Sequence, residues 1–144
     1  MGLDNYIYVR SKTAKGSQFL KQNFNYIEDE YFHDGRYEFN YMRKNWGIRN
    51  EIIKSIFGGE HDWKDESWDG YYWFKIKDIE RFINIFRYFL DEEHWINEAS
   101  SIWEWHQGIR SLAESIFNLR ELEELAEAEE ITDDDIELWF IDSY

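Results

Sequence analysis

The fold of this chain is decided by residues 71–90, which read YYWFKIKDIERFINIFRYFL. Residues 71–76 are rich in aromatic and β-branched side chains, a composition typical of a β-strand. Asp78 is expected to cap a helix, because apolar residues then recur every three or four positions up to Leu90. A strand that leads directly into an amphipathic helix predicts an α+β fold, in which helices cover a small sheet.

The flanking sequence extends this pattern in both directions. Further strands are predicted where aromatic and β-branched residues gather or alternate: 6–9, 37–41 and 136–141. Further helices are predicted where apolar residues keep a helical spacing: 42–57, 102–117 and about 118–129. Gly58 is expected to end the first of these helices, and Asn118 to break the helical pattern before the last one. Residues 11–17 are predicted to be a loop and residues 132–135 a turn.

The predicted architecture is a single α+β domain, residues 1–144, with a small, mainly antiparallel sheet packed against three to five helices. A chain of 144 residues lies within the usual size range of one domain. Aromatic residues make up 20% of the chain, more than a core of this size requires. Some rings are therefore expected on the surface, where Tyr and Trp suit recognition. An unusually aromatic core is the alternative.

Charge is distributed unevenly along the chain. The net charge is −15, and residues 1–72 carry ten Lys and Arg against twelve Asp and Glu, whereas residues 73–144 carry six against nineteen. Such a protein repels nucleic acid and anionic membranes and attracts basic protein surfaces. The expected partner is therefore a protein with a basic, nucleic-acid-binding surface, with no direct nucleic-acid or membrane binding. A surplus of exposed rings would also allow a homodimer.

The familiar signatures of enzyme chemistry are absent from the sequence. The chain has no cysteine, no Gly-x-Ser-x-Gly motif and no phosphate-binding Gly-rich loop. His94 and Glu98 are metal-ligand residue types four positions apart, but they lack the further ligands at fixed spacing that identify a metal site. We therefore predict no catalytic residue, no metal and no cofactor. No apolar run is long enough to cross a bilayer, so a cytoplasmic protein is expected.

The densest charge lies between residues 114 and 137, where eleven Asp and Glu fall within 24 positions. On a helix, carboxylates three or four residues apart lie about 5–6 Å from one another. This density is comparable to that of a DNA strand, whose phosphates advance about 3.4 Å along the axis. Such an array can occupy a basic channel of a nuclease or DNA-binding complex. An acidic helix that only confers solubility is the alternative.

The predicted partner-binding residues combine six acids of this segment with two aromatic anchors: Glu121, Glu124, Glu127, Asp133, Asp134, Asp135, Trp103 and Trp139. Trp103 is included because it points away from the apolar face of its helix. That face is predicted to include Leu112, Ile116 and Phe117.

Basic residues cluster near the other end of the chain. Arg10, Lys12, Lys15 and Lys21 lie close together in the sequence. Such clusters usually form a solvated face or pair with the protein's own acids. A phosphate-binding surface is the alternative.

The chain opens with Met1-Gly2-Leu3-Asp4-Asn5-Tyr6, and Tyr41-Met42-Arg43-Lys44 precedes a predicted helix. These two segments resemble the motifs of a family of small, mostly uncharacterised bacteriophage proteins, whose opening motif is Met-Gly-Leu-Asp-x-Tyr. The residues that match the family motifs and are candidates for a shared role are Asp4, Tyr6, Tyr41, Arg43 and Lys44. The resemblance departs at Arg49, where the family usually has histidine. It implies a phage origin and expression in the cytoplasm of an infected bacterium, and no settled activity.

These observations lead to one main hypothesis and two alternatives. The main hypothesis is a phage-encoded acidic interaction protein that inhibits a host nucleic-acid-handling defence protein, of anti-CRISPR or anti-restriction type, by nucleic-acid mimicry. The first alternative is a small phosphate- or nucleotide-binding enzyme, in which Arg43 and Lys44 hold a phosphate and Asp4 acts as a base. The second is a phage assembly or regulatory protein that uses its acids only for solubility.

Overall fold

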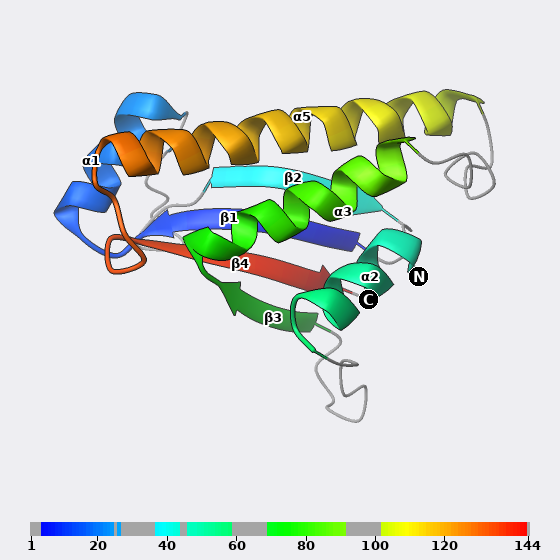
Figure 1. Ribbon diagram of the computed structural model, residues 1–144, viewed down its shortest axis with the longest axis horizontal. Helices are drawn as coiled ribbons and strands as arrows, with labels where there is room; N and C mark the ends of the chain where they lie inside the picture. The colour runs from blue at the N-terminus through cyan, green and yellow to red at the C-terminus, as the bar shows by residue number, and fades with distance from the viewer. Residues whose placement is uncertain are drawn as a thin grey trace.

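A four-stranded antiparallel sheet forms the base of the molecule (Figure 1). The computed structural model describes residues 4–24, 26, 37–43, 46–58, 69–91 and 102–143. The strands are β1 (Asp4–Ser11), β2 (Tyr37–Arg43), β3 (Asp69–Phe74) and β4 (Ile136–Ser143). Their order in the sheet is β2-β1-β4-β3, so the central pair joins segments from opposite ends of the sequence.

Helices cover one face of this sheet, which confirms the predicted α+β fold. They are α1 (Ala14–Asn23), α2 (Trp46–Ser55), α3 (Ile79–Asp91) and α5 (Ile102–Ala128). A short 3₁₀ helix, Ile76–Asp78, joins β3 to α3. In Figure 1, α3 and α5 run side by side across the sheet, and α1 and α2 lie toward its two ends. No helix among the described residues is both long and apolar enough to span a membrane.

The alternation of side chains along the strands separates the two faces of the sheet. In β1, Ile7 and Val9 are buried under the helices, whereas Tyr6 and Tyr8 point to the opposite face. The core is strongly aromatic: Phe82 of α3 is fully buried. Its ring contacts those of four neighbours, Phe57, Phe74, Phe86 and Phe140. The segment that decides the fold therefore supplies the centre of the core.

A bulge in the β1–β2 pair adapts β2 to the helix above it. The register shifts between Ile7 and Tyr8, which pair with Asn40 and Glu38, so Phe39 is the extra residue. Both Phe39 and Asn40 are consequently buried. The Asn40 amide donates a hydrogen bond of 2.6 Å to the Ser115 hydroxyl, which anchors β2 to α5.

A buried ion pair joins α2 to the central strand β4. Arg49 donates hydrogen bonds of 3.0 and 2.7 Å from Nε and Nη2 to Oδ2 of Asp142, and the Asn5 amide donates one of 2.7 Å to Oδ1. Asn5 and Asp142 are fully buried and Arg49 is nearly so. Burial and the negative charge of Asp142 raise the pKa of the neighbouring Tyr72, and the positive charge of Arg49 opposes this rise. Arg49 therefore has a structural role at this position.

Several predicted elements are confirmed by the structure. The strands predicted at 6–9, 37–41 and 136–141 correspond to β1, β2 and β4. The helix predicted at 42–57 is α2, although it begins at Trp46 because Met42 still pairs with Asn5 in the sheet. Gly58 follows α2 with a left-handed φ of 72°, as expected of a residue that ends a helix.

The predicted loop at 11–17 is wrong, because α1 begins within it. Thr13 caps this helix: its hydroxyl oxygen accepts a hydrogen bond of 3.1 Å from the Gly16 N–H. Gly16 itself is buried against the backbone of Asp135. The small polar residues that suggested a loop are therefore the cap and a close packing contact of a helix.

The predicted cap of α3 is also wrong. Asp78 lies in the 3₁₀ helix before α3, and its carboxylate accepts a hydrogen bond of 3.1 Å from the N–H of Lys75. Its carboxylate thus binds the N–H of Lys75, the N-cap of the shorter helix, one turn before the start of α3.

The predicted break at Asn118 does not exist, because α5 continues for 27 residues. Its buried side is marked by residues three or four positions apart: Leu112, Ser115, Leu119, Leu122 and Ala126. Phe117 lies off this row and is 68% exposed, although the sequence analysis placed it on the apolar face. An unbroken helix fixes which of its carboxylates point outward.

Candidate functional site

The exposed side of α5 carries an acidic row with one aromatic residue in it. Glu114, Glu124 and Glu127 are exposed, and Glu121 is half-buried between them. Phe117 occupies the position between Glu114 and Glu121 on the same side of the helix. We call these five residues the acidic ridge.

The spacing of the acidic ridge resembles that of a nucleic-acid backbone. Glu121, Glu124 and Glu127 are three residues apart, so each advances about 4.5 Å along the helix axis. The phosphates of a DNA strand advance about 3.4 Å. Arg110 forms a 3.0 Å ion pair with Glu114, but both side chains are well exposed, so this pair neutralises little of the ridge.

The three aspartates after α5 do not behave alike, although the sequence analysis assigned all of them to partner binding. Asp133 accepts a hydrogen bond of 2.9 Å from the N–H of Ile76. Asp135 accepts hydrogen bonds from the Thr132 N–H at 3.1 Å and from the Thr13 hydroxyl at 2.9 Å, and these bonds, the first foremost, lower its pKa. Asp134 is exposed beside them. Two of the three carboxylates therefore hold the turn at 132–135 in place.

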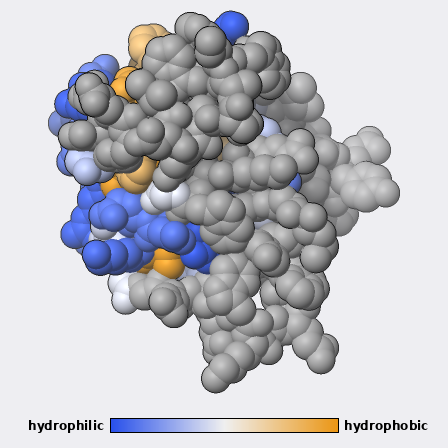
Figure 2. All heavy atoms as spheres, turned by 90° about the vertical axis from the view of Figure 1, so that its right-hand side faces the viewer, coloured by the Kyte–Doolittle hydropathy of each residue, from blue (hydrophilic) through white to orange (hydrophobic). Residues whose placement is uncertain are grey.

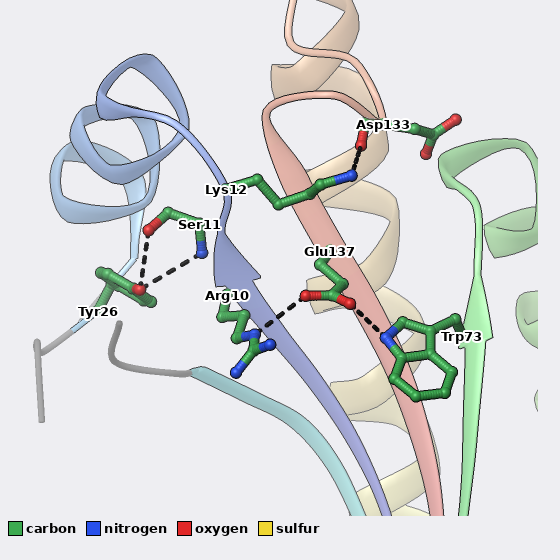
Figure 3. A network of polar contacts seen from close by, with 7 residues as sticks. All are labelled: Arg10, Ser11, Lys12, Tyr26, Trp73, Asp133 and Glu137. Carbon is green, nitrogen blue, oxygen red and sulfur yellow. Dashed lines mark hydrogen bonds and ion pairs between the residues drawn. The ribbon is translucent and has the colours of Figure 1, made fainter. Parts of the chain in front are cut away.

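Part of the N-terminal basic cluster lies against this same turn. Lys12 donates to the carbonyl of Asp133 at 3.1 Å (Figure 3), and Lys15 donates to the carbonyl of Glu130 at 2.9 Å. Lysines near the free carbonyls at a helix C-terminus stabilise the helix. These lysines thus contact main-chain carbonyls of the C-terminal segment, whereas Arg10 of the same cluster forms the expected pair with one of the protein's own acids, Glu137.

Trp139, one of the predicted anchors, lies on the sheet face opposite the helices. The guanidinium of Arg10 stacks over its ring, 4.2 Å from the ring centroid, and forms a 3.0 Å ion pair with Glu137. Figure 3 shows Glu137 between Arg10 and Trp73, whose indole N–H donates to the same carboxylate. Partial burial raises the pKa of Glu137, but the donors around it, Arg10 foremost, outweigh burial and lower it. Trp139 is therefore separate from the acidic ridge.

Three of the motif residues that suggested a phage family, Asp4, Tyr6 and Tyr41, lie on the same face of the sheet. Tyr41 donates a 3.1 Å hydrogen bond to Asp4, and its ring packs on Tyr6 with centroids 5.0 Å apart. The backbone register places Arg43 opposite Asp4 in the β1–β2 ladder. Lys44 lies outside the described residues. The structure thus brings the two motifs together, and Asp4 serves there as a hydrogen-bond acceptor.

Other sequence predictions fall where side chains are not described. Trp103 belongs to α5, but its side chain is outside the described part, as are His94 and Glu98. Within the residues that the structure does describe, no group of three or more potential ligands could hold a metal ion.

The end of the molecule near α2 presents a mostly hydrophilic described surface, with only small hydrophobic areas (Figure 2).

A carboxyl pair joins α3 to α5 next to the acidic ridge. Burial, a hydrogen bond with Glu80 and the negative charge of Glu80 raise the pKa of Glu123 to about 7, while Arg120 opposes this rise. When Glu123 is neutral, its proton can form the hydrogen bond with Glu80; when Glu123 ionises, two negative charges face each other. The contact between the two helices therefore depends on pH.

This pair predicts that the protein loses stability as pH rises from about 4.5 to 7, the ordinary and the folded-state pKa of Glu123. Across this window the folded state holds a proton that the unfolded chain has released, so a higher pH favours unfolding. Because Glu123 is half-exposed, screening limits the effect to about 1 kcal/mol. In urea unfolding, the Glu123→Gln variant should show no such loss of stability between pH 4.5 and 7, whereas the control variant Glu127→Gln should show the same loss as the unchanged protein. An unchanged pH profile in Glu123→Gln would exclude the pair as its source.

Comparison of the chain with known protein families, curated proteins and solved structures finds no match.

Proposed function

We propose that this is a bacteriophage-encoded interaction protein that binds a basic, nucleic-acid-binding surface of a host defence protein and inhibits it. The acidic ridge of α5 carries the proposal. It places four carboxylates along about 20 Å of helix, at about half the linear density of the phosphates of one DNA strand, and the helix is anchored to the sheet by Asn40 and Ser115. The phage origin comes from the resemblance of the two motifs, and the defence target comes from that origin combined with the acidic charge.

Phe117 supports binding over mere solubility. A solubilising helix needs no exposed aromatic ring, yet Phe117 is 68% exposed in the middle of the carboxylates. Rings in this setting act as anchors, because they bury a large apolar area while surrounding charges orient the partner. Phe117 therefore joins Trp103 as a proposed aromatic anchor on α5, whereas Trp139 lies on the other side of the sheet.

The turn after α5 contributes less than the sequence indicated. Asp133 and Asp135 hold the turn through their hydrogen bonds to Ile76 and Thr13. The proposed contact surface is therefore the ridge from Glu114 to Glu127, extended by Asp134.

The decisive experiment captures partners of the tagged protein from a bacterial lysate that contains defence systems. Capture is compared at about 50 and 300 mM salt, with and without competing DNA, because contacts between charged surfaces weaken steeply over this range. A nucleic-acid-handling protein that salt and DNA both release is the expected result. Capture of only membrane or structural proteins, or of none, would contradict the proposal.

A matched pair of variants tests the surface itself. Glu124→Lys/Glu127→Lys reverses two ridge charges, and Glu38→Lys/Glu51→Lys makes the same change in net charge on β2 and α2. We expect the ridge variant to lose at least about tenfold in affinity for the captured partner at low salt, and the control to lose much less. Equal losses would show that net charge, and not the ridge, drives binding. Phe117→Ser should weaken binding at both salt concentrations, since its contribution is not ionic.

A further inference from the structure

The sheet face opposite the helices carries aromatic residues in two rows across the strands. The register places Tyr41, Tyr6, Ile141 and Tyr71 in one row, and Tyr8, Trp139 and Trp73 in the next. Neighbouring rings contact each other within and between the rows: centroids are 5.7 Å apart for Trp73 and Trp139, and 6.3 Å for Tyr71 and Trp139. We call Tyr71, Trp73 and Trp139, on β3 and β4, the aromatic face.

The outer part of the aromatic face is open to solvent. Trp73 is 59% exposed and Tyr71 is 51% exposed. Both lie on β3, which is an edge strand of the sheet, and both rings pack against Trp139. The hydrogen bond from Trp73 to Glu137 further fixes the indole. Two large rings are thus held rigidly with about half of their surface available to a partner.

The protein itself shows which chemistry this face accepts. The Arg10 guanidinium stacks on Trp139 while Glu137 holds its Nε at 3.0 Å (Figure 3). Trp73 offers a second indole beside the same carboxylate, and its exposed side carries no guanidinium of the described residues. A planar cation that approaches from solvent would therefore meet an arrangement like the one that Arg10 occupies.

The charge around the aromatic rows favours a cation over nucleic acid. The described side chains on this side of the sheet include one arginine, Arg10, and three acids, Asp4, Glu38 and Glu137. The whole chain carries a net charge of −15. Single-stranded nucleic acid also stacks on aromatic rings, but its platforms need a positively charged groove along the phosphates. Charge complementarity therefore selects a basic ligand.

We propose that the aromatic face binds an arginine-containing segment of a partner protein, with a guanidinium stacked on Trp73 and a second contact to Tyr71. This site lies on β3 and β4, on the opposite side of the sheet from α5. It does not depend on the acidic ridge, and each surface can be tested while the other is intact.

The test uses a blocked peptide with three arginines separated by glycines, titrated into the isotopically labelled protein at low salt. The indole N–H resonance of Trp73, assigned with Trp73→Phe, reports on the aromatic face. We expect this resonance to shift on binding, and Trp73→Ala to weaken binding to the face about fivefold to tenfold. The ridge variant Glu124→Lys/Glu127→Lys should leave the Trp73 shift in place. The same peptide with citrulline in place of arginine should bind much more weakly, because citrulline keeps the shape and loses the charge.

Controls separate a lost contact from a lost fold. Circular dichroism checks that Trp73→Ala remains folded. A second variant, Tyr71→Ala, removes the other exposed ring without affecting the hydrogen bond from Trp73 to Glu137, and it should also weaken binding of the peptide. Shifts confined to α5, or equal binding of the citrulline peptide, would overturn the proposal. So would tighter binding at Trp73 of an oligodeoxythymidylate or of cellohexaose. A Trp73 shift that follows protein concentration without peptide would identify a second copy of this chain as the occupant instead.

Discussion

Arg49→Met is expected to lower the free energy of unfolding by about 3–5 kcal/mol. The change leaves the fully buried carboxylate of Asp142 without its cation, although the Asn5 amide still donates to it. A buried charge that loses its partner retains the whole cost of leaving water, which is why such a variant loses more than the ion pair itself contributes. Urea unfolding at pH 7, followed by circular dichroism, measures the loss.

A second substitution distinguishes an unpaired charge from poor packing. Arg49→Met/Asp142→Asn removes both charges and keeps an oxygen that can accept from Asn5. We expect the double variant to regain more than half of the lost stability, since its buried site is neutral. A loss of less than about 1 kcal/mol in Arg49→Met would show that water reaches Asp142 and that the pair is not insulated. Tyr72 gives a second readout, because removing Arg49 should raise its pKa further.

Gly16→Ala is expected to destabilise the protein by about 3 kcal/mol. In most helices the same change stabilises by roughly 1 kcal/mol. Here an added Cβ would lie 2.0 Å from the carbonyl oxygen of Asp135 and 2.8 Å from its carbon. The Asp135 backbone cannot yield easily, because its carbonyl accepts a 2.8 Å hydrogen bond from the N–H of Lys12 and its side chain is bound to Thr13. Thermal and urea unfolding test the sign as well as the size.

Gly58→Ala is the matched control for this prediction. Gly58 has open space around the position of a Cβ but a φ of +72°, so alanine there costs only the left-handed conformation, about 1 kcal/mol. The two glycines thus resist substitution for different reasons, one steric and one conformational. A stabilised Gly16→Ala would mean that α1 shifts away from the turn after α5.

The sequence predicted the strands and the fold class well because their signal is local. Alternation in β1 and the aromatic run of β3 do not depend on other segments. The start of α1 was missed because Thr13 and Gly16 have the composition of a loop, and only the distant Asp135 shows why a glycine is needed there. The break at Asn118 was expected because the apolar pattern changes there. The helix nevertheless continues, because α3 and β2 pack along α5 and stabilise it.

The same limits apply to the candidate surfaces. Acid density was visible in the sequence, but the orientation of each carboxylate follows from the phase of an unbroken α5, which also exposes Phe117. The structural use of Asp133 and Asp135 depends on Ile76 and Thr13, far away in the sequence. The expectation of surface rings is confirmed for the described chain by its exposed large aromatic residues: Tyr41, Tyr71, Trp73, Tyr88 and Phe117.

The central pairing of β1 with β4 has a consequence for biosynthesis. Asn5 and Asp142 hydrogen-bond across 137 positions, so β1 must wait for β4 to be translated and released from the ribosome. At about 5–20 residues per second this delay is roughly 7–27 s. During that time Ile7 and Val9 lack the partner strand that completes the sheet beside them. The nascent chain therefore depends on chaperones or on its own charge to remain dispersed until β4 has emerged from the ribosome.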